Sequence, residues 1–269
     1  MKKTGALTID QLDAMKRSGE KIAMLTCYDA TFARCLDRAG IDIVLVGDSL
    51  GMVVQGRATT VGVTVEDIAY HVACVAQGLQ RSFLLADLPF GSYHDAPTAM
   101  ASAVQLMSAG GAMVKLEGAG PMLDVVGYLA ARGVPVCGHL GLTPQSIHQL
   151  GGFKVQARDD AGAHQLLLDA RALQDAGARL LVLECVPAVL GREVSAALDI
   201  PVIGIGAGAG CDGQVLVMHD MLGLGMGGGD KAPKFVANFM SGAGSVQGAF
   251  EAFLMAVREG RFPGPEHEY

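Results

Sequence analysis

The chain repeats one pattern: a short apolar run typical of a buried strand, followed at once by an ionisable side chain. In IDIVLVGDS (41–49) the run is apolar except for Asp42, and Asp48 and Ser49 follow the glycine that ends it. Such runs are typical of strands that are buried on both faces of a parallel sheet. Four further runs lead to groups of the same kind: Asp87, Lys115 with Glu117, His139, and Glu184. We therefore expect these strand ends to converge on one site.

Eight strand-like runs alternate with helix-like segments, which predicts a parallel α/β protein. The expected strands cover 21–29, 41–46, 82–86, 112–116, 134–138, 179–184, 200–205 and 215–222. An open doubly wound sheet also fits this alternation, but the even spacing and the length of 269 residues favour a closed (β/α)8 TIM barrel, which needs about 250 residues. We expect one domain over residues 1–269, with a short N-terminal helix (8–19) on the bottom of the barrel and a C-terminal helical extension (247–259).

Composition excludes several classes of partner. The net charge of −7 and the pI near 5.4 argue against nucleic acid. The first 20 residues lack the apolar core of a signal peptide, and no apolar run approaches the ~18 residues that a membrane span needs. Six scattered cysteines without a CxxC pair predict buried, reduced thiols rather than a disulfide framework or a zinc site. We expect a cytoplasmic protein.

Three carboxylates come from successive strands: Asp48, Asp87 and Glu117. Neighbouring strands lie about 4.8 Å apart, so these side chains could reach a common ion. Three carboxylates so close together would repel one another without a cation, and all-oxygen ligation indicates Mg²⁺ rather than zinc. The alternative is that each carboxylate caps a helix or forms a salt bridge independently.

Lys115 stands two residues before Glu117 and therefore points to the same face of its strand. A buried ammonium group is costly unless it meets an anion, and a substrate carboxylate is one suitable partner. A structural ion pair with one of the nearby acids is the alternative.

Glu184 follows the apolar run LLVL on the far side of the ring. An acid in such surroundings tends to have a raised pKa and could serve as a general base, although it could also cap the helix beside Pro187. His139, between two non-polar residues, is either a catalytic group or a hydrogen-bonded core residue. Together these groups predict a metal-dependent barrel enzyme that removes a proton beside the carbonyl of a small anionic substrate.

Two irregular segments are candidates for parts of this site. The stretch 140–160 is longer than the ~12–15 residues of an ordinary loop, which is typical of a lid or binding loop. GIGAGAG (204–210) does not match the dinucleotide-binding pattern, because a strand follows it instead of a helix. It predicts a tight backbone turn against the site.

Motifs along nearly the whole chain resemble the 3-methyl-2-oxobutanoate (ketopantoate) hydroxymethyltransferase family. They are LTCYD (25–29), VGDSLGMVVQG (46–56), DLPFGSY (87–93), KLEG (115–118), GHLGLTPQ (138–145), KVQAR (154–158), LECVP (183–187) and GIGAGAGCDGQVLVMHDMLG (204–223). The chain departs from the family at Ala157, where Gly is usual, and at Phe153, where Tyr is common. These departures concern the loop and not the ionisable groups.

The resemblance implies a barrel of the phosphoenolpyruvate/pyruvate superfamily, a homodecamer of two stacked pentameric rings, and Mg²⁺ as cofactor. It implies that the enzyme transfers a one-carbon unit from the folate 5,10-methylenetetrahydrofolate to the 2-oxo acid 3-methyl-2-oxobutanoate. The product is 2-dehydropantoate, on the route to pantothenate and coenzyme A.

The resemblance also implies a role for each matching residue. Asp48 and Asp87 would ligate the metal, and Glu117 would ligate it or hold its water. Ser49 and Lys115 would contact the substrate carboxylate, as part of a substrate site with Asp48, Asp87 and His139. Glu184 would accept the proton, and His139 would hydrogen-bond the reacting oxygen or the incoming carbon.

Two other functions remain open on sequence grounds. One is a Mg²⁺-dependent carbon–carbon lyase or phosphonomutase on the same barrel, since Cys137-Gly138-His139 faintly resembles the catalytic cysteine loop of isocitrate lyases. The other is a barrel that only binds a ligand, which would leave both the acidic cluster and the opposed Glu184 without a purpose.

Overall fold

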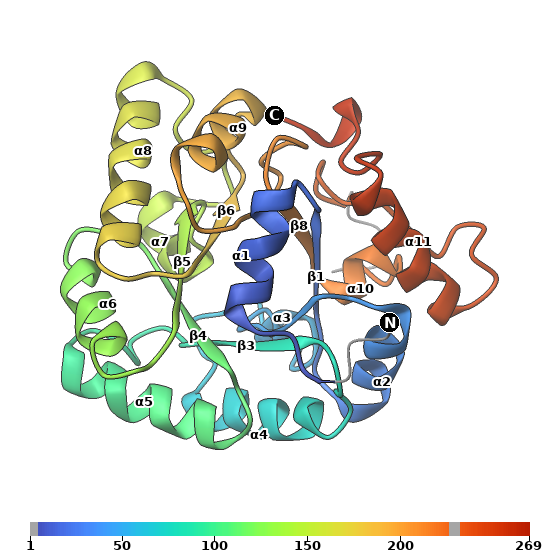
Figure 1. The fold of residues 1–269 in the computed structure, drawn as a ribbon, viewed down its shortest axis with the longest axis horizontal. Helices are drawn as coiled ribbons and strands as arrows, with labels where there is room; N and C mark the ends of the chain where they lie inside the picture. Colours follow the sequence, from blue (N-terminus) through green and yellow to red (C-terminus); the bar gives the residue numbers. More distant parts are fainter. Residues whose placement is uncertain (1–4, 226–231) are drawn as a thin grey trace.

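Eight parallel strands close into a barrel in chain order, and β1 pairs with both β2 and β8 (Figure 1). The computed structural model describes residues 5–225 and 232–269. The strands are β1 Ile22–Thr26, β2 Ile43–Val46, β3 Phe83–Asp87, β4 Met113–Glu117, β5 Val136–Gly141, β6 Leu180–Glu184, β7 Val202–Ile205 and β8 Gly213–Leu216. This confirms the predicted (β/α)8 barrel.

Helices connect the strands and surround the barrel (Figure 1). They are α2 Ala30–Ala39, α4 Val65–Ala76, α5 Ala96–Ser108, α6 Met122–Ala130, α8 Asp160–Asp175 and α9 Ala188–Ala197. Shorter turns of helix follow several strand ends: α3 Leu50–Val53, 3₁₀-helix η1 Pro144–Ser146, α7 Ile147–Leu150 and α10 Met218–Met221. Near the C-terminus are α11 Val246–Arg258, which packs against α2 and β1, and 3₁₀-helix η2 Pro265–His267.

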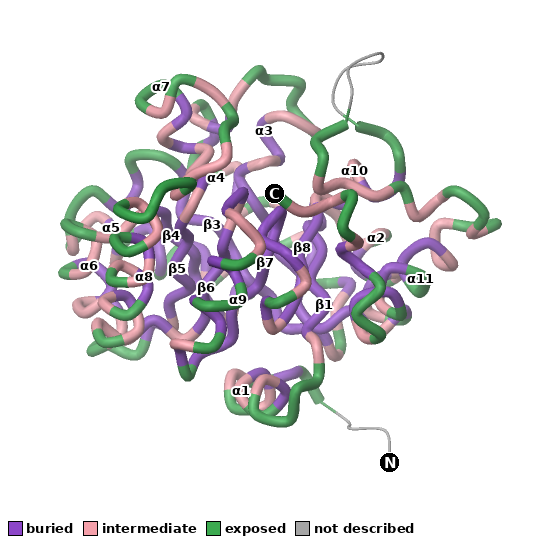
Figure 2. Tube along the Cα trace, turned by 90° about the horizontal axis from the view of Figure 1, so that it is seen from above, coloured by how far each residue is buried: buried purple, intermediate pink, exposed green. Residues whose placement is uncertain are grey.

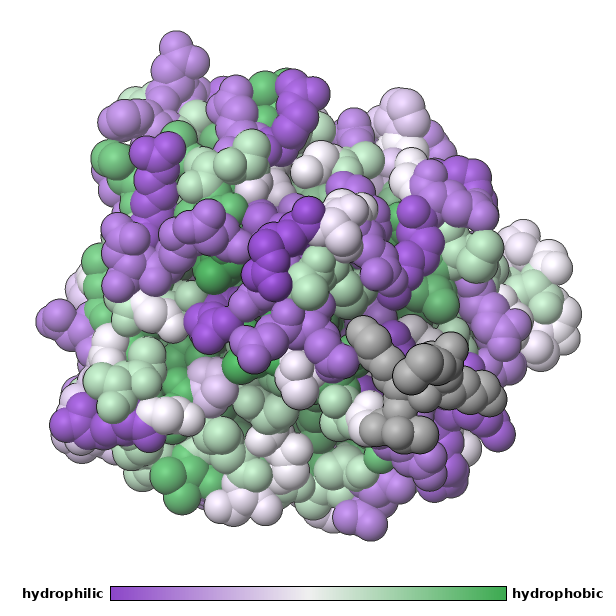
Figure 3. Space-filling model, viewed as in Figure 1, coloured by the Kyte–Doolittle hydropathy of each residue, from purple (hydrophilic) through white to green (hydrophobic). Residues whose placement is uncertain are grey.

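Helix α1 (Ile9–Ser18) covers the N-terminal end of the barrel, as predicted. Thr8 and Gln11 form a capping box at its start, and Gly19 ends it with a left-handed φ of 75°. Its apolar face, with Leu12 and Met15, packs onto the side chains that fill the barrel. Figure 2 shows α1 at one end of the barrel and α3, α7 and α10 at the other. Seen from the α1 end, hydrophilic side chains lie over the middle of the face (Figure 3).

The alternation of side chains along each strand decides what fills the barrel and what lies outside it. In β1, Ile22 and Met24 belong to the inner cluster, whereas Ala23 and Leu25 pack against the surrounding helices. Because this period is two residues, a polar residue placed two positions after an inner apolar one also points inward. The inner apolar layers therefore lie beneath whatever the strands carry at their C-terminal ends.

The predicted eighth strand over 215–222 is wrong in its bounds. Strand β8 begins at Gly213, where an added Cβ would lie 2.3 Å from the Ile22 carbonyl oxygen, and it ends at Leu216. The ladder stops where β1 stops, because the Thr26 hydroxyl accepts a hydrogen bond from the Met218 N–H at 2.9 Å. Residues 218–221 form α10 instead, whose buried Met218 and Met221 have the i, i+3 spacing of one helix face.

Two further expectations concern membrane spans and the number of domains. Across residues 5–225 and 232–269, no helix is long and apolar enough to cross a membrane. That residues 1–269 form a single domain stays a prediction, since residues 1–4 and 226–231 lie outside the described part.

Candidate active site

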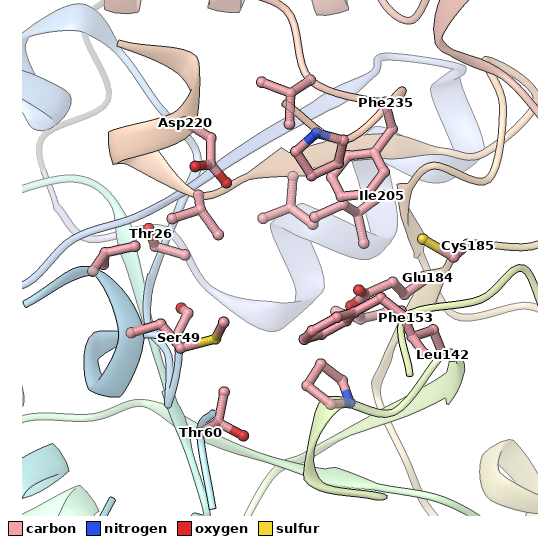
Figure 4. Close-up of a pocket in the computed structure, with 18 of the residues that line it drawn as sticks. Thr26, Ser49, Thr60, Leu142, Phe153, Glu184, Cys185, Ile205, Asp220 and Phe235 are labelled. Atoms are coloured by element: carbon pink, nitrogen blue, oxygen red, sulfur yellow. The ribbon is translucent and has the colours of Figure 1, made fainter. Parts of the chain in front are cut away.

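A cavity of about 870 Å³ opens at the C-terminal end of the barrel, away from α1 (Figures 2 and 4). The structure brings all seven predicted site residues to its lining: Asp48, Ser49, Asp87, Lys115, Glu117, His139 and Glu184. Large apolar pockets that also hold a few convergent polar groups are the usual ligand sites of proteins. The cavity is therefore the candidate active site.

Strand periodicity explains why these side chains meet. Met113 belongs to the inner apolar layer of β4, so Lys115 and Glu117 point into the barrel above it. The same spacing carries β5 from Cys137 to His139 and β6 from Val182 to Glu184. In this way β4, β5 and β6 each place an ionisable residue directly above an inner apolar one.

Asp48, Asp87 and Glu117 lie buried together at the ends of β2, β3 and β4. The Asp87 Oδ2 accepts a hydrogen bond from the Asp48 N–H at 3.0 Å. Burial raises the pKa of Asp48 to about 8, and the charges of Asp87 and Glu117 add to this rise. None of the three is the N-cap of a helix, so the explanation as independent helix caps is wrong.

These carboxylates do not by themselves form a ready-made metal cage. In the described part of the chain, no three His, Cys, Asp or Glu side chains stand close enough to hold an ion. Part of the reason is that the side chain of Asp48 accepts a hydrogen bond from Gln145 and that of Asp87 pairs with Lys115. Mg²⁺ is often bound through only one or two carboxylates, with waters and substrate completing its shell. The assignment of the metal ligands stays a prediction.

Lys115 is a buried cation among the acids, and its Nζ lies 2.8 Å from the Asp87 Oδ1. The ion pair that was the structural alternative for Lys115 is thus present. Burial opposes the charge on Lys115, but Asp87, Glu117 and Asp48 outweigh burial and raise the Lys115 pKa above its usual value. Lys115 also lines the cavity, so its ammonium group stays charged where a ligand anion could meet it.

His139 lies between two carboxylates. Its Nδ1 is 3.4 Å from the Glu117 Oε1 and its Nε2 is 3.3 Å from the Glu184 Oε2. Burial and the nearby charge of Lys115 lower the His139 pKa, but the interactions with Glu117 and Glu184 outweigh them and raise it to about 9. His139 is therefore an imidazolium near neutral pH and can donate hydrogen bonds from both ring nitrogens.

Glu184 ends β6 and keeps 13% of its side chain exposed, in contrast to the fully enclosed acids opposite. The helix that follows has Pro187 as its N-cap with no side-chain capping bond, so Glu184 does not cap it. The next residue, Cys185, has a φ of 47°, a left-handed conformation that costs roughly 1–3 kcal/mol in a residue other than glycine. Glu184 and Cys185 both line the cavity on either side of this bend (Figure 4).

Two residues outside the predicted set hold this site together. The Gln145 side chain donates to the Asp48 Oδ2 at 2.8 Å, and its backbone N–H donates to the Glu117 Oε2 at 3.0 Å. Tyr28 holds Ser49 at 2.8 Å between the two hydroxyl oxygens. Gln145 belongs to the motif GHLGLTPQ (138–145) and Tyr28 to LTCYD (25–29), but neither residue is ionisable at neutral pH and the strand pattern assigns neither a role.

The rest of the cavity wall is mostly apolar. Phe153, from the predicted binding loop, and Phe235 line it on different sides (Figure 4). The segment 140–160 is only partly irregular, since it contains the end of β5, η1 and α7. The turn after β7 is as tight as predicted, because a Cβ on Gly208 would lie 2.6 Å from the Ala188 Cβ.

Cys137 does not take part in the cavity. It is fully buried beneath the polar layer, in the inner apolar cluster of the barrel. Burial raises the pKa of its thiol to about 12. A catalytic cysteine of the isocitrate lyase kind needs an accessible thiolate, so this part of the alternative function has no support in the structure.

Comparison with known proteins decides the family. The family model for ketopantoate hydroxymethyltransferase matches residues 6–265. The chain belongs to the ketopantoate hydroxymethyltransferase family. It is 58% identical over 264 residues to the 3-methyl-2-oxobutanoate hydroxymethyltransferase of Burkholderia vietnamiensis (strain G4 / LMG 22486), an alignment that covers 98% of this chain and 96% of the relative. The enzyme of that name from Thiobacillus denitrificans (strain ATCC 25259 / T1) is also 58% identical, with 98% and 99% covered.

Solved structures share the fold of this ketopantoate hydroxymethyltransferase family member at low sequence identity. A putative phosphonomutase from Burkholderia cenocepacia J2315 is 16% identical with a TM-score of 0.62, covering 79% of this chain and 95% of the other. Phosphonopyruvate hydrolase in complex with oxalate and Mg²⁺ is 11% identical with a TM-score of 0.61, covering 78% and 81%. A 2,3-dimethylmalate lyase of the PEP mutase/isocitrate lyase superfamily is 17% identical with a TM-score of 0.57, covering 77% and 80%.

Family membership over nearly the full length makes this chain an enzyme, a hydroxymethyltransferase with a TIM-barrel fold. The expectation of a barrel that only binds a ligand is thereby wrong.

Proposed function

We propose that the enzyme transfers a one-carbon unit from 5,10-methylenetetrahydrofolate to 3-methyl-2-oxobutanoate, with water, and releases 2-dehydropantoate and tetrahydrofolate. The observation that carries the mechanism is the row of Lys115, His139 and Glu184 on the inner faces of three neighbouring strands. A charged amine, an imidazolium and an accessible carboxylate side by side suit the binding of a 2-oxo acid and its enolisation.

In this proposal Lys115 and Ser49 bind the carboxylate of the oxo acid. The neighbouring acids keep Lys115 protonated despite its burial. The Tyr28 hydroxyl holds the Ser49 hydroxyl in place at the mouth of β2. Both groups are positioned before any ligand arrives, which reduces the entropy lost on binding.

Glu184 then removes the proton from C3 of the oxo acid. Its accessible carboxylate is held near His139, at 3.3 Å, and points into the cavity. His139 is protonated near neutral pH, so its positive charge, held between Glu117 and Glu184, stabilises the negative charge that develops on the substrate. The carbon that has lost its proton forms a bond to the methylene carbon of the folate, whose bonds to N5 and N10 break. Water supplies the hydroxyl oxygen, and tetrahydrofolate leaves with both nitrogens protonated, one proton coming from C3 and one from water.

The residues around Asp48 fit Mg²⁺. The donor set consists of carboxylate oxygens, and the buried Glu117 Oε1 has the His139 Nδ1 at 3.4 Å but accepts no hydrogen bond of good geometry. The raised pKa of Asp48 results from burial and from the excess negative charge around it, which a divalent cation would neutralise. Asp48, Asp87 and Glu117 would hold the ion, and the ion, when bound, would act as a Lewis acid that stabilises negative charge on the keto oxygen.

The folate donor, the cytoplasmic location and the homodecamer of two pentameric rings belong to the same proposal. They follow from the family resemblance. Light scattering of the purified protein would test the oligomer, with ten chains of 27.8 kDa as the expected mass and a monomer as the result that overturns it.

The reaction itself is tested by NMR of mixtures that contain the enzyme, Mg²⁺ and 3-methyl-2-oxobutanoate. The proposal expects 2-dehydropantoate to form only when 5,10-methylenetetrahydrofolate is added. Cleavage of a 2-hydroxy acid or a phosphonate without folate, in place of this transfer, would establish the lyase or phosphonomutase alternative.

A further inference from the structure

Asp220 is a carboxylate in the cavity wall that the proposed chemistry does not use. It lies on α10, directly after β8, and is half-buried. In Figure 4 it is directed into the cavity, on the side away from Glu184 and Phe153. The acidic cluster stands on β2, β3 and β4, so Asp220 belongs to a separate part of the wall.

Its oxygens have no partner among residues 5–225 and 232–269. No Lys, Arg or His nitrogen of this part of the chain lies within 4.0 Å of them, and none of its side chains donates to them. Burial raises the pKa of Asp220, and no neighbouring charge contributes to the shift. A carboxylate that burial destabilises and nothing satisfies has its full hydrogen-bonding capacity left for a ligand.

The surroundings of Asp220 are apolar and partly aromatic. Phe235, Ile205 and Phe153 line the cavity across from Asp220, and Thr26 lies on the same side as Asp220 (Figure 4). Aromatic and branched side chains of this kind pack against flat ring systems. The whole cavity, at about 870 Å³, lies toward the upper end of the roughly 300–1,000 Å³ that enclose drug-sized ligands, and it is far larger than a small oxo acid requires.

The charge of Asp220 selects the kind of ligand. A 2-oxo acid is an anion, and a second carboxylate facing it would repel it. A single carboxylate among apolar side chains also lacks the several oxygens that bind Mg²⁺ or Ca²⁺. A flat ring with adjacent N–H donors fits this setting, because a carboxylate accepts two parallel hydrogen bonds and the apolar side chains can pack against the faces of the ring.

We propose that Asp220 binds the pterin ring of the folate co-substrate through the N3–H and 2-amino donors of its 2-amino-4-oxopyrimidine edge. Phe235 and the neighbouring aliphatic residues pack against the ring. This inference rests on the proposed folate donor and adds to it the residue that recognises the pterin. The pterin subsite thus lies on β8 and α10, opposite the side from which Glu184 takes the proton.

The test compares the wild type with Asp220→Asn, which keeps the shape but replaces one acceptor by a donor. Binding of tetrahydrofolate in the presence of the oxo acid should weaken roughly 10–100-fold, as expected when a buried hydrogen bond to a charged group is lost. The KM for the oxo acid and the folate-free exchange of its C3 proton should change less than about twofold. Asp199→Asn, at an exposed position outside the cavity, is the matched control and should bind tetrahydrofolate as the wild type does.

A ligand-side experiment avoids any question of folding. A tetrahydrofolate analogue without the 2-amino group should bind the wild type roughly 10–100-fold more weakly than tetrahydrofolate does. For Asp220→Asn, the affinities for the analogue and for tetrahydrofolate should be about equal. Equal binding of tetrahydrofolate by the wild type and Asp220→Asn would overturn the subsite alone. Loss of folate-free exchange in Asp220→Asn would also overturn it, because the residue would then act in enolisation or folding. If the wild type does not bind tetrahydrofolate, the proposed donor is wrong and the subsite falls with it.

Discussion

Gln145 joins the segment after β5 to two of the cavity's carboxylates, through its side chain to Asp48 and its backbone to Glu117. The amide also donates to the Leu88 carbonyl oxygen and accepts from the Tyr93 hydroxyl, so all of its polar atoms have partners. This makes Gln145 a positioning residue for the acidic cluster. Residues of this kind orient the groups that bind a ligand or metal without touching the reacting atoms.

Replacing Gln145 should disturb the orientation of Asp48. We expect Gln145→Ala to lower transfer activity by roughly 10–100-fold and to raise the Mg²⁺ concentration needed for half-maximal activity. A Mg²⁺ titration of product formation measures both effects, with Gln165→Ala on the exposed face of α8 as the control. An unchanged Mg²⁺ dependence would contradict the positioning role.

Ala157 is the departure from the family motif that the structure makes visible. Its φ is 52°, the left-handed region in which a Cβ is strained and glycine is not. Ala157→Gly should therefore raise the free energy of unfolding by about 0.5–1 kcal/mol, less than the full strain because glycine gains freedom in the unfolded chain.

Denaturant titration compares this variant with Ala172→Gly in the last turn of α8. The helical control should lose about 1 kcal/mol or more, since glycine is a poor helix former. If both variants were destabilised alike, the left-handed conformation of Ala157 would not be a source of strain.

At the scale of single residues, the sequence identified the ionisable residues of the cavity but not the residues that hold them in place. Glu117 and Glu184 stand at the ends of apolar runs, where the strand period places them on the inner face. Asp48 is out of phase with the inward Ile43 and Leu45, and it reaches the cavity because the chain turns after the end of β2. Gln145 and Asp48 are 97 residues apart, and an uncharged amide in a loop has no period that would pair it with a strand end. Asp220 was not recognised as a cavity residue because 215–222 was predicted to be a strand, whereas residues 218–221 form α10.

The segment between β5 and α8 joins the buried polar residues of the cavity to its apolar wall. Gln145 anchors its first part, and Phe153 lines the cavity further along while remaining 59% exposed. A side chain that is so exposed gains contact area only when a ligand or closure covers it. We propose that this segment covers the folate and excludes water.

Deleting residues 146–155 should raise the KM for folate more than it slows folate-free enolisation, because the deletion spares Gln145. Phe153→Ala is the milder variant, and it should raise the folate KM in the same direction. Steady-state kinetics and C3 proton exchange provide the two readouts. Equal effects on the folate KM and on the rate of C3 proton exchange would show that the segment acts on the buried polar residues and not on the folate.

Elements with a strong apolar period were predictable, and those set by tertiary contacts were not. The capping box of α4, with Thr64 and Asp67, was readable directly from the sequence. The end of β8 was not, because it depends on where β1 stops and on the hydrogen bond from Met218 to Thr26.

The whole molecule buries most of its thiols in the layers around and inside the barrel. The fully enclosed cysteines are Cys27, Cys137 and Cys211, and burial raises the pKa of each thiol to about 12. Cys35 and Cys74 are only half-buried. The reactive thiolate form is therefore suppressed at the enclosed sites over the whole physiological pH range.

Brief treatment of the native protein with iodoacetamide at pH 8 should label Cys35 and Cys74 and leave the enclosed three unmodified. Peptide mass spectrometry locates the labels, and the protein in denaturant, where all thiols titrate normally, is the control. Rapid labelling of Cys137 in the native state would contradict the packing of the barrel interior.

The eightfold alternation of strands and helices made the closed barrel predictable, because few architectures bury eight parallel strands in order. An association of copies, which belongs to the proposed function, is not predictable in this way. It depends on surface patches that have no period along the chain.

The most direct test is exchange of the C3 proton of 3-methyl-2-oxobutanoate in D₂O, followed by NMR without folate. Wild type and Glu184→Gln would be compared, each with Mg²⁺ and with EDTA. We expect exchange only in the wild type with Mg²⁺, since removal of the proton needs both the base and the cation. Samples that show no exchange would be measured again with tetrahydrofolate present, because its binding could complete the site. Exchange in Glu184→Gln at the wild-type rate, or none in the wild type under either condition, would contradict enolisation at this site.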